Sequence, residues 1–378
     1  MKKLLIIYGS YGSGHKTIAE AIASYFSNFG KDYEIKLLDV TKYSNISGKA
    51  SIKLFDLIIN HRAELMFNFC YELVDNKVGV YGEKLFVKRS FDNKRMRNDI
   101  KKFNPDITIS THYFGGSIIT YYNKINLINS KIVSVITDYV SHSFWLLNHK
   151  DMDAYIVANE VVKKELVEKG VLSRKIYPYG LPFDKTKLLN IKPKNEIIKT
   201  YKINQNKKTY IFFGGGSSGS MAYYDYFKSL AKKEYPINLI FICGKNKKLE
   251  HKAKELVKKK GYNNVIVLGF VKDVFSLLNV ADFVISKPGG ATVTESIIMK
   301  TPLITIPGVG GQEKYNAKFV EKKRFGLNVR TNFGLNRAVR KTMSDKYLEK
   351  RFKRNLEKVK PNESLENILN LVNKMTDK

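Results

Sequence analysis

Short apolar runs alternate with longer amphipathic stretches along most of the chain. Residues 3–8 and 34–40 are apolar runs, and residues 16–29 between them repeat apolar side chains at helical spacing. This alternation predicts parallel strands joined by helices. Further strands are predicted at residues 107–110, 132–137 and 155–158, and then at 209–213, 238–243, 265–268, 282–286 and 303–306. The fold class expected is α/β, with two Rossmann-like, doubly wound domains.

The alternating pattern loosens between the two halves, from Gly180 to about Lys208, in a lysine-rich stretch that contains prolines. We interpret this stretch as the domain linker. Residues 1–185 then form an N-terminal domain and residues 186–360 a C-terminal domain, as a length of 378 residues allows. Residues 361–378 are expected to form a C-terminal helix that packs back on the N-terminal domain.

The chain is basic, with a formal net charge of +31. Residues 1–181 carry 26 basic and 18 acidic side chains, whereas residues 182–378 carry 40 and 17. Such a field favours nucleic acid, anionic lipid or phosphorylated small molecules. No nucleic-acid-binding module is recognisable, so nucleic acid is not an expected partner.

Two distant cysteines, Cys70 and Cys243, form neither a disulfide framework nor a metal cluster, and a reducing cytoplasm is the simplest interpretation. No apolar run approaches the length that crosses a bilayer. We therefore expect any contact with a membrane to be made from one side.

The most informative segment is Ser286-Lys-Pro-Gly-Gly-Ala-Thr-Val-Thr-Glu295. Gly289 and Gly290 let the backbone approach an anion, and the first amides of the following helix would point at it. Thr292 and Glu295 also have the spacing of a capping box, so Glu295 either caps the helix or binds vicinal hydroxyls, as acidic side chains do for a nucleotide ribose.

Glycines and polar side chains follow other strands of the second half. Gly214, Gly215 and Gly244 come directly after apolar runs, at the edge where ligands of such sheets bind. Residues 308–316 add Gln312, Glu313 and Asn316, whose amides and carboxylate suit sugar hydroxyls. The alternative is a polar loop that only opens a helix.

The loop after the first strand, Gly9-Ser-Tyr-Gly-Ser-Gly-His15-Lys-Thr17, approaches a Walker A loop but has His15 in place of the lysine. The one-residue displacement of the lysine argues against a phosphotransferase. The order of the glycines also argues against a dinucleotide site. What remains is an imidazole at a helix start, either a general base for a hydroxyl or a helix cap.

Asp138 follows the buried run at residues 132–137, and His142 and Trp145 come soon after it. Asp138 is a second candidate base, a group that orients His15, or a turn cap.

Residues 52–74 are apolar and aromatic, and residues 84–102 combine basic side chains with Phe86, Phe91 and Met96. Together they suggest a surface that inserts apolar groups into lipid and presents cations to anionic headgroups. An ordinary core helix and a solvated face are the alternatives.

Several of these segments together resemble one family. They are Gly12-Ser-Gly-His15, Thr137-Asp-Tyr139, Cys243-Gly-Lys-Asn246, Leu268-Gly-Phe-Val271, the segment 286–295 and the segment 307–316. Their combination is similar to that of the processive diacylglycerol glucosyltransferases of glycosyltransferase family 28. This family includes the monogalactosyldiacylglycerol synthases and, more remotely, the peptidoglycan lipid-intermediate N-acetylglucosaminyltransferase.

The resemblance implies a GT-B fold, an inverting mechanism without metal or other cofactor, and a place at the cytoplasmic face of the membrane. A UDP-hexose, with glucose expected, would bind the C-terminal domain, and diacylglycerol or a glycolipid the N-terminal domain. The donor residues it implies are Phe270 and Val271 for uracil, Gly289, Gly290, Ala291 and Thr292 for the diphosphate, Glu295 for the ribose, and Gln312, Glu313 and Asn316 for the sugar and its neighbours. Ser286 is a further expected donor-site residue. His15 and Asp138 would serve catalysis, with Gly12, Gly14, His142 and Trp145 on the acceptor side. Transfer of N-acetylglucosamine to a polyprenyl-linked acceptor is the alternative activity.

Overall fold

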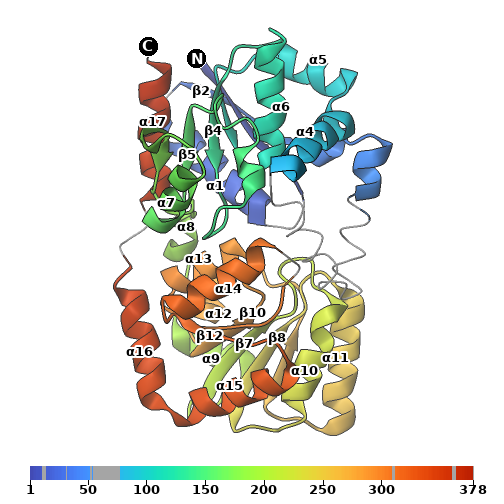
Figure 1. The fold of residues 1–378 in the computed structure, drawn as a ribbon. Coiled ribbons are helices and arrows are strands. Elements are labelled where there is room, and N and C mark those ends of the chain that lie inside the picture. The colour runs from blue at the N-terminus through green and yellow to red at the C-terminus, as the bar shows by residue number, and fades with distance from the viewer. Residues whose placement is uncertain are drawn as a thin grey trace. The chain divides into compact units, whose positions relative to one another are not determined.

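The structure is a computed structural model that describes residues 1–10, 14–30, 32–51, 53, 77–308, 311–359 and 363–377. The chain divides into two compact units (Figure 1). The first extends to Asp184 and also contains the C-terminal helix, and the second takes up the chain from Lys185. Each unit is described by itself.

The first unit is built on a six-stranded parallel sheet in the order β2-β1-β3-β4-β5-β6. Its strands are β1 (Lys2–Tyr8), β2 (Tyr33–Asp39), β3 (Ile107–Ser110), β4 (Lys131–Val135), β5 (Ala154–Ile156) and β6 (Ile176–Tyr177). Its helices are α1 (Gly14–Phe29), α4 (Lys77–Phe91), α5 (Lys94–Phe103), α6 (Tyr113–Lys124), α7 (Glu160–Glu168) and α17 (Ser364–Thr376), with short 3₁₀ turns η1 (Val40–Tyr43), η2 (Ser143–Leu146) and η3 (Ser173–Lys175).

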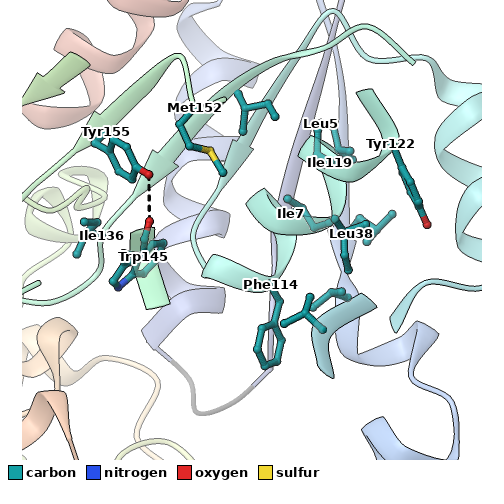
Figure 2. Close-up of a cluster of buried hydrophobic side chains, with 14 of the residues drawn as sticks. Leu5, Ile7, Leu38, Phe114, Ile119, Tyr122, Ile136, Trp145, Met152 and Tyr155 are labelled. Atoms are coloured by element: carbon teal, nitrogen blue, oxygen red, sulfur yellow. Dashed lines mark hydrogen bonds between the residues drawn. The ribbon is translucent and has the colours of Figure 1, made fainter. Parts of the chain in front are cut away.

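The central strands of this sheet are buried on both faces, which is why they are continuous apolar runs. One core layer lies between the sheet and α4, α5 and α6, and Figure 2 shows part of it, including Phe114, Ile119 and Tyr122. On the other face, α1 and α17 pack against β1, β3 and β4 through residues such as Ile22 and Ile368. The C-terminal helix therefore shares the core of the first unit.

The second unit has another six-stranded parallel sheet, in the order β12-β11-β10-β7-β8-β9. Its strands are β7 (Lys208–Phe213), β8 (Ile237–Ile242), β9 (Val265–Leu268), β10 (Phe283–Ser286), β11 (Leu303–Thr305) and β12 (Gly326–Asn328). Its helices are α8 (Thr186–Leu189), α9 (Lys194–Tyr201), α10 (Tyr224–Ala231), α11 (Lys247–Lys260), α12 (Val274–Leu278), α13 (Gly290–Ile298), α14 (Gln312–Lys322), α15 (Asn332–Ser344) and α16 (Lys346–Glu357), with the 3₁₀ turn η4 (Met221–Tyr223).

Two sequence interpretations differ from this fold. The predicted linker contains two short helices, α8 and α9, and packs on the second unit: α9 buries Ile197, and the preceding Lys192 donates its backbone N–H to Ser276 Oγ at 2.8 Å. Phe91 and Met96, predicted to face lipid, are fully buried, since α4 and α5 turn their apolar faces to the core. The apolar segment 52–74 lies outside the described residues, apart from Lys53.

Candidate active site

His15 is the second residue of α1, and two neighbouring strand ends hold its ring. Its Nδ1 lies 2.6 Å from the Thr111 carbonyl oxygen, after β3, and 3.1 Å from Thr137 Oγ1, after β4. Thr111 Oγ1 in turn donates to the backbone oxygen of His15 at 2.9 Å. A carbonyl oxygen can only accept, so Nδ1 carries the proton. In the neutral ring Nε2 then has the lone pair that a general base needs.

A second histidine, which the sequence interpretation missed, packs directly against His15. The ring centroids of His15 and His112 lie 4.6 Å apart, edge to face, and the His112 ring stacks on Tyr113 at 4.5 Å. Burial, and then the nearby His15 and His142, lower the pKa of His112 well below its usual value. His112 therefore stays neutral and adds no positive charge beside His15. The only sequence signal was one histidine just after a predicted strand.

The other predicted residues of this unit lie around the same edge. Asp138 and His142 are buried, and the His142 ring lies 5.6 Å from that of Tyr113. Trp145 is also in the core, and its backbone oxygen accepts a hydrogen bond from Tyr155 Oη at 3.0 Å (Figure 2). Trp145 is therefore part of the hydrophobic core that lies next to this edge.

The glycine-rich loop itself is only partly described. Gly12 lies outside the described residues, and Gly14 is the first residue of α1. Lys16, the lysine displaced by one residue from the Walker A position, is half exposed with its Nζ 3.5 Å from Glu20 Oε1. This placement agrees with the argument against a phosphotransferase.

In the second unit, β10 leads through a short turn into α13. Ser286 is the buried last residue of the strand, and Gly289 is the N-cap of α13 with no side-chain capping bond. The amides of Gly290, Ala291 and Thr292 are the first three of the helix and have no carbonyl four residues before them within it. Unpaired amides at the positive end of a helix dipole favour an anion such as a diphosphate.

The capping-box prediction for Glu295 is wrong. It requires Thr292 at the N-cap, but α13 begins two residues earlier, at Gly290. Among the described residues, the Glu295 side chain makes no hydrogen bond, and burial raises its pKa to about 7, against the attraction of Lys187. A half-buried carboxyl that makes no hydrogen bond to the described part of the chain is suited to accept hydrogen bonds from a ligand.

The loop after β11 brings a second carboxylate to the same edge. Glu313, at the start of α14, is buried, and its Oε1 lies 2.5 Å from Lys287 Nζ, in the turn before α13. Gln312 begins α14 and is half-buried, whereas Asn316 is fully buried one turn later. The sequence interpretation missed Lys287, although it lies inside the most informative segment.

Glycines let the loops after β7 and β8 pack closely. Gly215 and Gly244 have φ angles of +107° and +60°, which favour glycine. A Cβ on Gly244 would lie 2.6 Å from the Ser217 oxygen, and one on Gly214 would lie 3.0 Å from the Phe241 ring. These three predicted glycines therefore have a packing reason to be present, whatever ligand lies beside them.

Phe270 and Val271 follow β9, at the end of the sheet. Phe270 is 52% exposed, with Lys245 Nζ 5.2 Å from its ring centroid. Both residues line a cavity of about 320 Å³ together with Thr200 and Tyr201 of α9. An exposed aromatic ring beside such a cavity offers a face on which a planar base can stack.

In the part of the chain that the structure describes, no group of three or more His, Cys, Asp or Glu side chains is placed to hold a metal ion. Within the same residues, no helix has the length and apolar character needed to cross a membrane.

Solved structures with the same architecture define the class. A Staphylococcus aureus MnaA–UDP structure matches with a TM-score of 0.66 at 14% identity, over 100% of this chain and 97% of that one. Acinetobacter baumannii MurG matches with a TM-score of 0.63 at 14% identity, over 99% and 100%. The predicted fold is confirmed: the chain has the GT-B architecture.

Two family models identify the family. Residues 15–183 match the monogalactosyldiacylglycerol (MGDG) synthase model, and residues 210–369 match the glycosyltransferase family 28 C-terminal domain. The chain belongs to glycosyltransferase family 28 and is a glycosyltransferase that uses a UDP-sugar.

Curated relatives match over nearly the whole length. The processive diacylglycerol beta-glucosyltransferase of Bacillus subtilis (strain 168) is 26% identical, over 94% of this chain and 90% of its own. The protein of the same name from Bacillus pumilus is 26% identical, over 100% and 96%. The family resemblance inferred from the motifs is therefore confirmed.

Proposed function

We propose that this glycosyltransferase transfers glucose from UDP-glucose to the free hydroxyl of diacylglycerol, and then to the glucosylated product. The observation that carries the proposal is the near full-length match to relatives named processive diacylglycerol beta-glucosyltransferase. The MurG likeness supports the fold alone, so it does not favour N-acetylglucosamine transfer to a polyprenyl-linked acceptor.

The reaction proposed is a single displacement. The acceptor oxygen forms a bond to the anomeric carbon while the bond from that carbon to the UDP oxygen breaks, which inverts the configuration. His15 Nε2 takes the proton of the acceptor hydroxyl, since Nδ1 is held as a donor by the Thr111 carbonyl. Asp138 remains the alternative base.

The leaving group is UDP, and we propose that α13 stabilises the negative charge that grows on it. The amides of Gly290, Ala291 and Thr292 are already oriented before the reaction, so no reorganisation is needed as the charge develops. Glu295 is proposed to bind the ribose, Phe270 and Val271 to hold the uracil, and Gln312, Glu313 and Asn316 to contact the sugar. No metal or other cofactor is required in this scheme.

The acceptor remains in a bilayer, so the enzyme is proposed to work as a peripheral protein at the cytoplasmic face of the membrane. Helix α4 offers a suitable surface, because Tyr81 is 68% and Leu85 39% exposed beside the exposed cations Lys84, Lys88 and Arg89. Interfacial aromatics and cations of this kind favour anionic headgroups.

The test is a matrix of donors and acceptors. Purified protein is incubated with UDP-glucose, UDP-galactose or UDP-N-acetylglucosamine, each with diacylglycerol or a polyprenyl-linked acceptor in liposomes, and the lipids are identified by mass spectrometry. We expect glucosyl- and diglucosyl-diacylglycerol, formed equally well in excess chelator. Turnover only with another donor or acceptor would reject the assignment.

A further inference from the structure

The donor edge of the second sheet holds an ion pair whose lysine has no role in the proposed reaction. Lys287 Nζ lies 2.5 Å from Glu313 Oε1, and the two side chains are 27% and 11% exposed. Lys287 comes from the turn between β10 and α13, whereas Glu313 comes from the first turn of α14. The pair therefore joins the two loops that follow adjacent strands.

The space around the carboxylate is shaped by glycines. A Cβ added to Gly308 would lie 1.9 Å from Glu313 Oε2, and one added to Gly289 would lie 3.5 Å from Oε1. The backbone at Gly308 thus leaves room for this carboxylate and for no side chain of its own. Lys287 on one side and Gly308 on the other fix where the carboxylate lies.

The second oxygen of Glu313 is buried and has no hydrogen-bond partner among the described residues. Leaving a buried polar atom without a partner destabilises the folded protein, and more so for a charged group. Such an atom in a binding site is explained if a ligand supplies the missing donor. Carboxylate oxygens accept hydrogen bonds from hydroxyl groups in fixed directions, as recognition of a sugar requires.

We propose that Lys287 is a positioning residue for donor selection: it holds Glu313 by Oε1 so that Oε2 accepts a hydrogen bond from a hydroxyl of the bound sugar. This inference rests on the proposed function, in which Glu313 contacts the sugar of the UDP-hexose. Without the ammonium, Oε1 loses the ion pair that holds it, so the carboxylate can turn and discriminates hydroxyls less well. Lys287 acts through Glu313 and does not itself contact the reacting atoms.

The competing role for Lys287 is direct contact with the diphosphate, because it lies one residue before Pro288 in the anion-binding turn. The two roles differ in what they predict for UDP alone. A positioning role affects the sugar, so UDP-glucose binding weakens and UDP binding does not. Direct contact with phosphate weakens both ligands alike.

The experiment is isothermal calorimetry of UDP and UDP-glucose with the full-length wild type, K287M, K287R, E313Q and K287M/E313Q. The matched control is K208M, which removes a pair of similar exposure, Lys208 Nζ to Glu349 Oε2 at 2.8 Å. Lys208 is the first residue of β7, so it lies at the amino ends of the strands, whereas the donor site lies at their carboxyl ends. Melting temperatures are recorded for every variant.

We expect K287M to weaken UDP-glucose binding about tenfold and UDP binding less than twofold. In the double variant, E313Q should weaken UDP-glucose binding little beyond the effect of K287M alone, because the two residues are coupled partners. K287R should recover most of the affinity, and K208M should lower the melting temperature without changing either ligand's affinity. Equal weakening of UDP and UDP-glucose, additive effects of K287M and E313Q, or K287R as weak as K287M would each overturn the positioning role. A wild type that binds UDP but no UDP-hexose would overturn the proposed function as well.

Discussion

The carboxyl edges of the two sheets present opposite chemistry. In the first unit, His15 is held by a backbone carbonyl and a hydroxyl, and its neighbour His112 is kept neutral by burial. In the second unit, the edge combines helix amides with the Lys287–Glu313 ion pair and the carboxyl of Glu295.

The difference follows from what each edge is proposed to do. A general base must be uncharged before it takes a proton, and a nearby cation would lower its basicity. An anionic leaving group and a polyhydroxylated sugar need the reverse, namely fixed positive charge and acceptors.

Replacing His15 by alanine should lower kcat about 10²- to 10⁴-fold, the usual contribution of a general base. UDP affinity should change less than twofold, because the UDP site is proposed in the second unit. Steady-state kinetics and UDP calorimetry measure the two effects. A kcat within threefold of wild type would remove His15 as the base and leave Asp138.

Replacing Gly308 by alanine should raise the KM for UDP-glucose roughly 10- to 100-fold, since the loss of one or two good hydrogen bonds to a charged group has that size. The added Cβ would lie 1.9 Å from Glu313 Oε2 and displace the carboxylate. Gly82→Ala on α4 is the control, because nothing lies within 4 Å of a Cβ there. Equal KM values for the two variants would show that the carboxylate is not a donor-site group.

Glu295 should make UDP binding depend on pH. Its pKa is raised to about 7, and hydrogen bonds from ribose hydroxyls favour the ionised carboxylate. Affinity should therefore rise about tenfold from pH 6 to pH 8, as the ionised fraction increases through that pKa. In Glu295→Gln the affinity should be weaker and nearly independent of pH. An identical pH profile in the variant would contradict ribose binding.

The same pKa shift has a consequence for stability. The pKa of Glu295 in the folded protein is raised above its usual value of 4.5, so between about pH 4.5 and 7 the carboxyl is ionised in the unfolded chain but still protonated in the folded one. The contribution of Glu295 to the free energy of unfolding is therefore fully present at low pH and is lost as the pH rises through 7. Relative to Glu295→Gln, the melting temperature of the wild type should fall over this window.

The smallest effect expected is on membrane binding. Reversing one exposed cation of α4, as in Lys84→Glu, should weaken sedimentation with anionic vesicles about fivefold, since each cation near such a surface contributes about 1 kcal/mol. Lys164→Glu on α7 makes the same change of net charge in the same unit and is the control. If both variants bind alike, α4 is not the membrane surface.

The sequence predicted most of the sheets because their strands are buried on both faces and appear as apolar runs. Strands β6 and β12 were missed because each is the last strand of its sheet and is only partly buried, so neither is a continuous apolar run. Helix α9 was taken for a linker, since Ile197 is its only buried residue and lysines dominate its neighbourhood.

The candidate site was predictable where a motif joins a strand to a helix, as at residues 286–295. Pairings between distant residues were not, because nothing in the sequence indicates that Lys287 meets Glu313 or that Thr111 fixes the tautomer of His15. The cap predicted for Glu295 failed because Gly289 is the N-cap and α13 begins at Gly290, ahead of Thr292, which spacing alone does not show.

An inverting transfer of glucose to diacylglycerol fixes the anomeric configuration of the product, which proton NMR of the purified lipid measures. UDP-glucose carries an α linkage, so we expect β-glucosyl-diacylglycerol, formed in equal amount to the UDP released. An α-linked glycolipid, or release of UDP with no lipid-bound glucose, would contradict it.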